Sequence, residues 1–259
     1  MIFDTHAHYD DPAFDEDRDS LLPGLPKNGI GRVVNIGTNR ITCEKTLSLT
    51  KQYPFMYGAL GVHPSDLDDW QEEDYSWLYE KAGDRRIIAI GEIGLDYYWE
   101  KDEAKQAAQR QAFIRQLKLA KELSLPVVVH SREAAQDTMQ IVKQYGQGLG
   151  GMIHCYSYHA QDAVQYVKMG YCIGIGGVIT FKNAKKLWEV AEAIPPEAIV
   201  LETDCPYLAP EPFRGKRNCS LYLRYVVEAL SRCLQKSPEE IEALTFQNAL
   251  RIYRIDGDL

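Results

Sequence analysis

The sequence predicts an α/β protein built as a (β/α)8 TIM barrel, in a single domain spanning residues 1–259. Eight short apolar runs recur along the chain, and segments with helical periodicity lie between them. Strands that are apolar almost throughout are typical of a parallel sheet covered by helices on its faces. Eight strand–helix units favour a closed barrel over an open sheet, and barrels of this length commonly form one domain.

The eight apolar runs are predicted strands, and in chain order they are Met1–Phe3, Arg32–Ile36, Phe55–Val62, Ile87–Ile90, Pro126–Val129, Met152–Ile153, Tyr171–Ile175 and Ile199–Leu201. The clearest predicted helix is Asp102–Leu123, where Phe113, Leu117 and Ala120 fall on one face among polar residues. Pro238–Tyr253 is expected to form an extra C-terminal helix after the eighth unit.

Composition limits the functions that the chain can have. The net charge of −8 argues against broad electrostatic binding to nucleic acid, although it allows a local basic or metal-neutralised site. No apolar run is long enough to span a membrane, and the N-terminus lacks the pattern of a signal peptide. The six scattered cysteines are therefore expected to be reduced thiols in a cytoplasmic protein. The sequence shows no sign of an obligate protein partner.

Polar residues that can bind metal follow the predicted strands. His6 and His8 are two residues apart after the first strand, so their side chains are expected to point the same way. Five of the six histidines lie at strand ends, and only His159 does not. Since the carboxyl ends of barrel strands meet at one mouth, we expect these side chains to converge there. The candidates are His6, His8, His63, Glu92, His130, His154 and Asp204.

These residue types predict a metal centre. Imidazole and carboxylate suit Zn, Mn, Fe and Ni, and carboxylate also suits Mg. Six nitrogen and oxygen ligands are too many for one catalytic metal with an open position, so they favour two metals with one bridging carboxylate. Such a pair activates water and stabilises the leaving oxygen of a displacement. Cys155 and Cys205 follow candidate ligands directly, and we expect both to be packing residues.

Several segments together resemble the TatD family of metal-dependent deoxyribonucleases, which belongs to the amidohydrolase superfamily. The resemblance covers essentially the whole chain and rests on His6–His8, Gly91–Asp96, His130–Arg132, Ile153–Cys155, Glu202–Tyr207, Arg214–Asn218 and Asn248–Ala249. Two positions depart from the family pattern. Cys219-Ser220 stands where Glu-Pro is usual, which bears on loop rigidity and substrate preference. Tyr9 stands where leucine is common, from which we expect little consequence.

The resemblance implies a set of ligands for each of two metals, and it implies an activity. One metal would be held by His6, His8, Glu92 and Asp204, and the second by Glu92, His130 and His154, with Glu92 as the bridge. The implied catalytic residues are Asp204, Glu92 and His63, with Asp204 activating water and His63 near the substrate phosphate. The implied reaction is hydrolysis of DNA, as a 3′–5′ exonuclease acting on single strands or 3′ ends. The cofactors would be two divalent ions, drawn from Mg, Mn, Zn and Ni.

Basic and aromatic residues near the mouth have two interpretations. One interpretation is that phosphate groups are bound by Arg132, Arg214, Lys216 and Arg217. The alternative is that these side chains lie on a solvated surface or form local ion pairs. Tyr97, Tyr98 and Trp99 either stack on bases or pack their loop, and Tyr156 and Tyr158 pose the same choice.

Three function classes stay open at this point. The first is a DNA phosphodiesterase, and the second is a metal-dependent hydrolase of a small amide, ester or lactone. The acidity of the chain favours the second class, whereas the basic loop and the motifs favour the first. A non-enzymatic barrel protein is the third, and an intact set of ligands argues against it.

Overall fold

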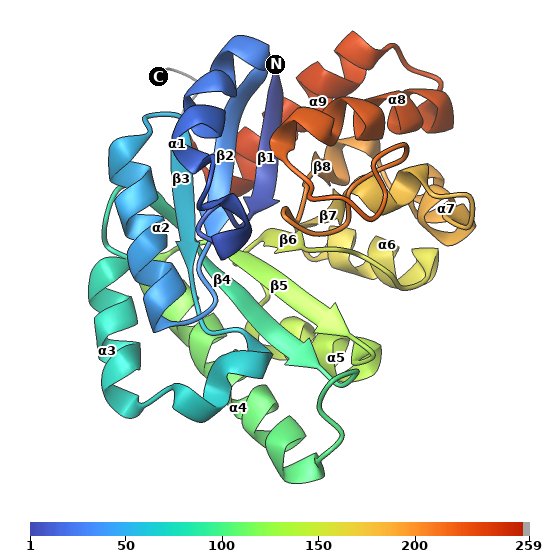
Figure 1. The fold of residues 1–259 in the computed structure, drawn as a ribbon. Coiled ribbons are helices and arrows are strands. Elements are labelled where there is room, and N and C mark those ends of the chain that lie inside the picture. Colours follow the sequence, from blue (N-terminus) through green and yellow to red (C-terminus); the bar gives the residue numbers. More distant parts are fainter. Residues whose placement is uncertain (256–259) are drawn as a thin grey trace.

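The computed structural model describes residues 1–255 and contains an eight-stranded barrel with strand order β1 to β8 (Figure 1). Every neighbouring pair from β1·β2 to β7·β8 is parallel. All eight predicted strands are present, and the predicted (β/α)8 fold is confirmed. Their bounds are β1 (Ile2–Ala7), β2 (Ile30–Ile36), β3 (Met56–Leu60), β4 (Ile87–Asp96), β5 (Val127–Arg132), β6 (Gly151–Ile153), β7 (Tyr171–Ile175) and β8 (Ile199–Leu201).

The barrel closes through the residues that follow β8. Ala7 forms an isolated parallel bridge with Cys205. The His8 amide donates to the Cys205 carbonyl at 2.8 Å, and the Asp204 amide donates to the His6 carbonyl at 3.0 Å. These hydrogen bonds join β1 to the segment after β8 and hold Asp204 beside His6 and His8.

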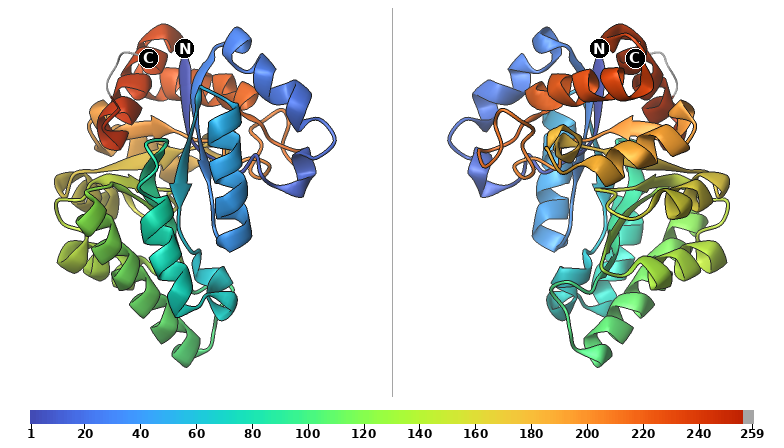
Figure 2. Two further views of the ribbon diagram at one scale, coloured as in Figure 1. Left: turned by 90° about the vertical axis from the view of Figure 1, so that its left-hand side faces the viewer. Right: turned by 90° about the vertical axis from the view of Figure 1, so that its right-hand side faces the viewer.

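Helices follow the strands and cover the outside of the barrel (Figures 1 and 2). They are α1 (Arg18–Leu21), α2 (Arg40–Gln52), α3 (Glu72–Lys81), α4 (Glu103–Leu123), α5 (Ala135–Tyr145), α6 (Ala160–Lys168), α7 (Lys185–Ala193), α8 (Leu223–Leu234) and α9 (Pro238–Tyr253). Helix α4 begins one residue after the predicted start because Asp102 is its N-cap and accepts from the Lys105 amide. Helix α9 has the predicted bounds and begins with a capping box at Ser237. Within residues 1–255, no helix combines the length and apolarity that crossing a membrane requires.

Buried apolar side chains form two clusters. The larger one lies where the helices pack on the strands. The smaller one takes Phe3, Val128, Met152 and other residues near the beginnings of the strands, together with four residues near the end of α9. The Tyr253 hydroxyl of α9 donates to the Thr5 carbonyl of β1 at 2.8 Å. Helix α9 therefore packs on the amino end of the strands, beside the N-terminus (Figure 2), and the carboxyl ends stay open.

Candidate metal centre

The carboxyl ends of the strands bring the predicted ligands together. His6 is on β1, Glu92 on β4 and His130 on β5, whereas His154 directly follows β6 and Asp204 follows β8. A cleft of about 820 Å³ opens at this mouth. Its lining includes His8, His63, Glu92, His130, His154 and Asp204, and His6 lies fully buried beneath it.

Two imidazole nitrogens lie near one oxygen of Glu92, and a carboxylate oxygen of Asp204 lies beside both nitrogens. The Nε2 atom of His6 lies 3.3 Å from Glu92 Oε2 and 3.0 Å from His8 Nε2. Asp204 Oδ1 lies 3.6 Å from His6 Nε2 and 3.4 Å from His8 Nε2. Atoms that ligate one cation at about 2.1 Å lie roughly 3.0 to 3.4 Å apart. His6 Nε2, His8 Nε2 and Glu92 Oε2 therefore form a group that could hold one cation, and Asp204 Oδ1 lies beside its two histidines.

A second group of nitrogens surrounds the other oxygen of Glu92. The Nδ1 atom of His130 lies 2.8 Å from Glu92 Oε1. The Nε2 atoms of His154 and His63 each lie 3.7 Å from the same oxygen. One carboxylate thus presents its two oxygens to two separate sets of histidines, which is the arrangement of a bridging ligand.

Each of three histidines has a fixed partner for its other ring nitrogen. His8 Nδ1 pairs with the Ile36 carbonyl at 3.0 Å, His154 Nδ1 with Glu202 at 2.8 Å, and His130 Nε2 with Asp96 at 3.1 Å. In a neutral ring, an N–H that donates to such a partner leaves the lone pair of the opposite nitrogen facing the cluster, where a cation would bind. Sequence reasoning gave no role to Asp96 or Glu202, although both lie inside the segments that carry the family resemblance.

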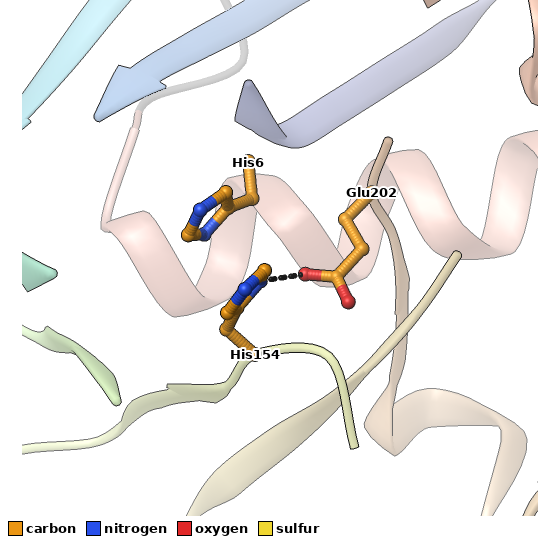
Figure 3. A group of neighbouring side chains, drawn as sticks. All are labelled: His6, His154 and Glu202. Atoms are coloured by element: carbon orange, nitrogen blue, oxygen red, sulfur yellow. Dashed lines mark hydrogen bonds and ion pairs between the residues drawn. The ribbon is translucent and has the colours of Figure 1, made fainter. Parts of the chain in front are cut away.

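His6 and His154 stack face to face, with ring centroids 3.5 Å apart, and Glu202 lies at the edge of the His154 ring, where it pairs with Nδ1 (Figure 3). His6 Nδ1 is buried and has no hydrogen-bond partner within residues 1–255. Burial and the charge of His154 lower the pKa of His6 below its ordinary value. The His6 imidazole is therefore neutral near pH 7, as a metal ligand must be.

The carboxylates of the cluster are ionised. Burial acts to raise the pKa of Glu92, but His154, His6 and the hydrogen bond from His130 hold it well below its usual range. Burial opposes ionisation of Asp204 in the same way, and His154 and His8 lower the pKa of that residue. The cluster thus offers ionised oxygen ligands together with imidazole nitrogens, a donor set that suits divalent metals.

The comparisons with known proteins agree with this donor set. Residues 3–254 match the family model of TatD-related DNases. The chain belongs to this family. It is 40% identical to YabD of Bacillus subtilis, described as an uncharacterized metal-dependent hydrolase, over 99% of this chain and 100% of YabD. It is 31% identical to a Cronobacter sakazakii protein named 3′-5′ ssDNA/RNA exonuclease TatD, over 97% of each chain.

A solved structure of the same family has the same fold. The TatD homologue YJJV of Escherichia coli superposes with a TM-score of 0.91 at 30% identity, covering 98% of each chain. The present TatD-family chain is accordingly a metal-dependent hydrolase.

His63 is placed as a hydrogen-bond donor in this TatD-family cleft. Its Nδ1 accepts from the Ser65 amide at 3.1 Å, so the proton of the neutral ring is on Nε2. That nitrogen faces the cluster, 3.7 Å from Glu92 Oε1. Burial and the neighbouring His130 lower the pKa of His63 to about 3, which keeps the ring neutral.

The four basic candidates separate into two groups. Arg132 lines the cleft, whereas Arg214, Lys216 and Arg217 are not among the described residues that line it. Arg217 forms a two-pronged ion pair with Asp17, at 2.7 and 2.6 Å, which neutralises its charge. The guanidinium of Arg214 lies 4.3 Å from the centre of the Phe181 ring. Lys45, a residue that sequence reasoning missed, also lines the cleft and donates to the Asp10 carbonyl.

The aromatic candidates also separate. Tyr97 packs its loop through a 2.7 Å hydrogen bond to Asp137, and Tyr156 is buried. Tyr158 holds Ser131 at 2.9 Å. Trp99 is 70% exposed and lines the cleft, so it is available for stacking. Among the cysteines, Cys205 is buried in the larger core cluster and Cys155 lines the cleft.

Proposed function

We propose that this chain is a two-metal phosphodiesterase that trims single-stranded nucleic acid from its 3′ end. The observation that carries the proposal is Glu92, whose two oxygens face two different sets of histidines. In this proposal one cation is held by His6, His8, Glu92 and Asp204, and the other by Glu92, His130 and His154. The histidine-rich donor set favours Mn, Zn or Ni over Mg.

The roles of the residues follow from their protonation. Bound divalent cations would supply Lewis acidity toward the phosphoryl group and acidify a water molecule. Asp204 is ionised and its side chain is 18% exposed, so its carboxylate can accept a proton from that water. His63 donates from Nε2 to a phosphate oxygen. Asp96 and Glu202 fix the orientation of His130 and His154.

The proposed substrate rests on the names of relatives and on the cleft. Two relatives are named 3′-5′ ssDNA/RNA exonucleases. Arg132 and Lys45 give the cleft two cations, and Trp99 gives it an exposed aromatic surface. The net charge of −8 favours the second candidate, a hydrolase of a small ester, amide or lactone on the same metal centre.

The decisive experiment incubates protein loaded with Mn²⁺ or Zn²⁺ with end-labelled single-stranded DNA and RNA, and with a panel of small esters, amides and lactones. We expect stepwise shortening from the 3′ end, which EDTA abolishes and added metal restores. Cleavage of the small compounds with no degradation of nucleic acid would establish the second candidate instead. Unchanged hydrolysis by fully demetallated protein would refute both.

A further inference from the structure

The two walls of the cleft differ in charge. Loops that follow β1, β2 and β3 supply one wall, which carries the carboxylates of Asp10, Asp11 and Asp66. Lys45 is the single lysine or arginine among the described residues of this acidic wall. The ends of β4 and β5 supply another part of the lining, which carries Trp99 and Arg132 together with Asp96, whose carboxylate pairs with His130. Since β1 and β5 lie across an eight-stranded barrel from each other, Arg132 lies across the metal centre from Asp10 and Asp11, whereas Asp66 follows β3, the neighbour of β4.

Arg132 is held ready for an anion. Its guanidinium lies 4.1 Å from the centre of the Tyr98 ring and 5.7 Å from that of Trp99. A guanidinium stacked on aromatic rings is oriented while its in-plane donors stay free. Within residues 1–255 Arg132 forms no ion pair, in contrast to Arg217 with Asp17. In a nucleic acid, the anionic group that a guanidinium binds is the phosphate.

The acidic wall is equally well ordered and suits uncharged groups. Asn35 donates to the Asp10 carboxylate at 2.8 Å, and Asn39 donates to Asp66 at 3.3 Å. These hydrogen bonds fix carboxylates that repel a phosphate and accept hydrogen bonds from hydroxyl or amino groups. A terminal nucleoside, with its 3′-hydroxyl and base, has such groups and lacks a phosphate.

We propose that this asymmetry sets the polarity of the strand in the cleft. The retained strand lies along Arg132, Tyr98 and Trp99, with the phosphate next to the scissile one, on its 5′ side, bound by Arg132. The departing 3′-terminal nucleoside faces Asp10, Asp11 and Asp66, which exclude a strand that continues past it. This inference rests on the proposed phosphodiesterase function and adds the direction of the strand and the residues that read its end.

The test uses three small substrates and the metal-loaded protein: the thymidine dinucleotide TpT, its 5′-phosphorylated form pTpT and its 3′-phosphorylated form TpTp. We expect the 5′-phosphate to raise kcat/KM about tenfold, since a charge-assisted hydrogen bond contributes roughly 1.5 kcal/mol or more. We expect the 3′-phosphate to lower kcat/KM by a similar factor. Arg132→Gln should remove most of the gain from the 5′-phosphate, and Asp66→Asn should relieve the penalty of the 3′-phosphate.

Arg232→Gln is the matched control, because Arg232 is an exposed arginine of α8 that does not line the cleft. Its ratio of kcat/KM for pTpT to that for TpT should equal that of the parent. Arg132→Lys should keep part of the gain because the charge remains. A parent that prefers TpTp over pTpT, or an Arg132→Gln variant with the parental ratio, would overturn the proposed polarity. A parent that cleaves none of the three, nor a longer strand, would instead refute the proposed function.

Discussion

At the scale of single residues, Glu92 and Asp204 separate metal binding from proton transfer. Glu92 faces both groups of histidines, whereas Asp204 Oδ1 lies beside His6 and His8. Both cations would be bound by the negative charge of Glu92, and Glu92→Gln removes that charge. We therefore expect metal content and activity to fall together. Asp204→Asn should lower kcat by at least about a hundredfold, the range of general-base catalysis, while metal remains bound by His130 and His154.

Metal content from elemental analysis and kcat from the DNA assay distinguish these two effects. His159→Ala is the control, because His159 is exposed at the start of α6 and lies outside the cleft. An Asp204→Asn variant with near-normal turnover would remove Asp204 from the role of base.

Glu202, like Asp96, is a residue whose importance only the structure revealed. Its carboxylate accepts from His154 at 2.8 Å and from the Cys155 amide at 2.7 Å, so it fixes both the ring and the backbone beside it. Glu202→Gln keeps the shape and removes the charge. We expect metal affinity to fall about 10- to 100-fold, as is usual when the outer partner of a ligating histidine is lost. Isothermal titration calorimetry with the metal measures this loss of affinity. An unchanged metal affinity in Glu202→Gln would contradict the proposed role of Glu202.

At the scale of elements, the sequence predicted what depends on local pattern. Apolar runs identified the eight strands, and histidines at their ends identified the mouth, because the barrel brings those ends together. The outer partners Asp96 and Glu202 were not predicted, since nothing in their spacing says which ring they face. The ion pair of Arg217 with Asp17 joins residues 200 positions apart, and the placement of Lys45 depends on α2. Such contacts follow from tertiary packing, which no local pattern encodes.

Two departures from the family pattern prove to be in contact. The Tyr9 hydroxyl, after β1, lies 2.7 Å from Ser220 Oγ and accepts from the Ser220 amide at 2.9 Å. Ser220 Oγ in turn donates to the buried Asp4 at 2.7 Å. The pair ties the loop after β8 to the first strand, a contact of Tyr9 that the sequence did not predict.

Tyr9→Phe should therefore leave the buried Ser220 amide without an acceptor. We expect the free energy of unfolding to fall by about 1 to 3 kcal/mol, the usual cost of a buried unsatisfied donor. Urea unfolding of the variant measures this change. Tyr79→Phe on α3 serves as the control, because Tyr79 is 48% exposed and its stability effect should be close to zero. Equal stabilities of the two variants would show that the contact is energetically neutral.

At the scale of the whole molecule, the buried charges of the mouth link stability to pH. Burial acts to lower the pKa of His8 and His154, but the hydrogen bond from His8 to Asp204 raises the first to about 9, and the charges of Glu202 and Glu92 raise the second to about 10. A raised folded-state pKa stabilises the fold fully below the unfolded value of about 6.5, and this contribution is lost as the pH approaches 9 and 10.

Metal-free protein should accordingly lose thermal stability between pH 7 and pH 8, where unfolded cysteines, with a pKa of about 8.5, are still mostly protonated. Protein with bound metal should lose less, because the cation replaces protons on the same nitrogens. Thermal unfolding with EDTA and with Mn²⁺, at half-unit steps of pH, makes the comparison. A metal-free Tm that rises over this range would contradict the assigned protonation states.

The charge of the whole molecule also limits how it binds a strand. With a net charge of −8, contact energy toward nucleic acid must come from the metal centre and from the few cations in the cleft. Each phosphate contact contributes a slope of about −0.7 to the logarithm of affinity against the logarithm of salt on single strands. One or two contacts, from Arg132 and Lys45, predict a shallow slope of roughly −0.7 to −1.4.

Arg132→Gln should flatten this salt slope by about 0.7. Replacing Arg214, Lys216 and Arg217 together with glutamine should leave the slope nearly unchanged. Asp17 already neutralises Arg217, and none of the three residues lines the cleft. Fluorescence anisotropy with a labelled single strand measures both slopes, with every variant made in the Asp204→Asn background so that the strand is not cleaved. A triple variant with the flatter slope would place the strand over the loop after β8 instead of along Arg132.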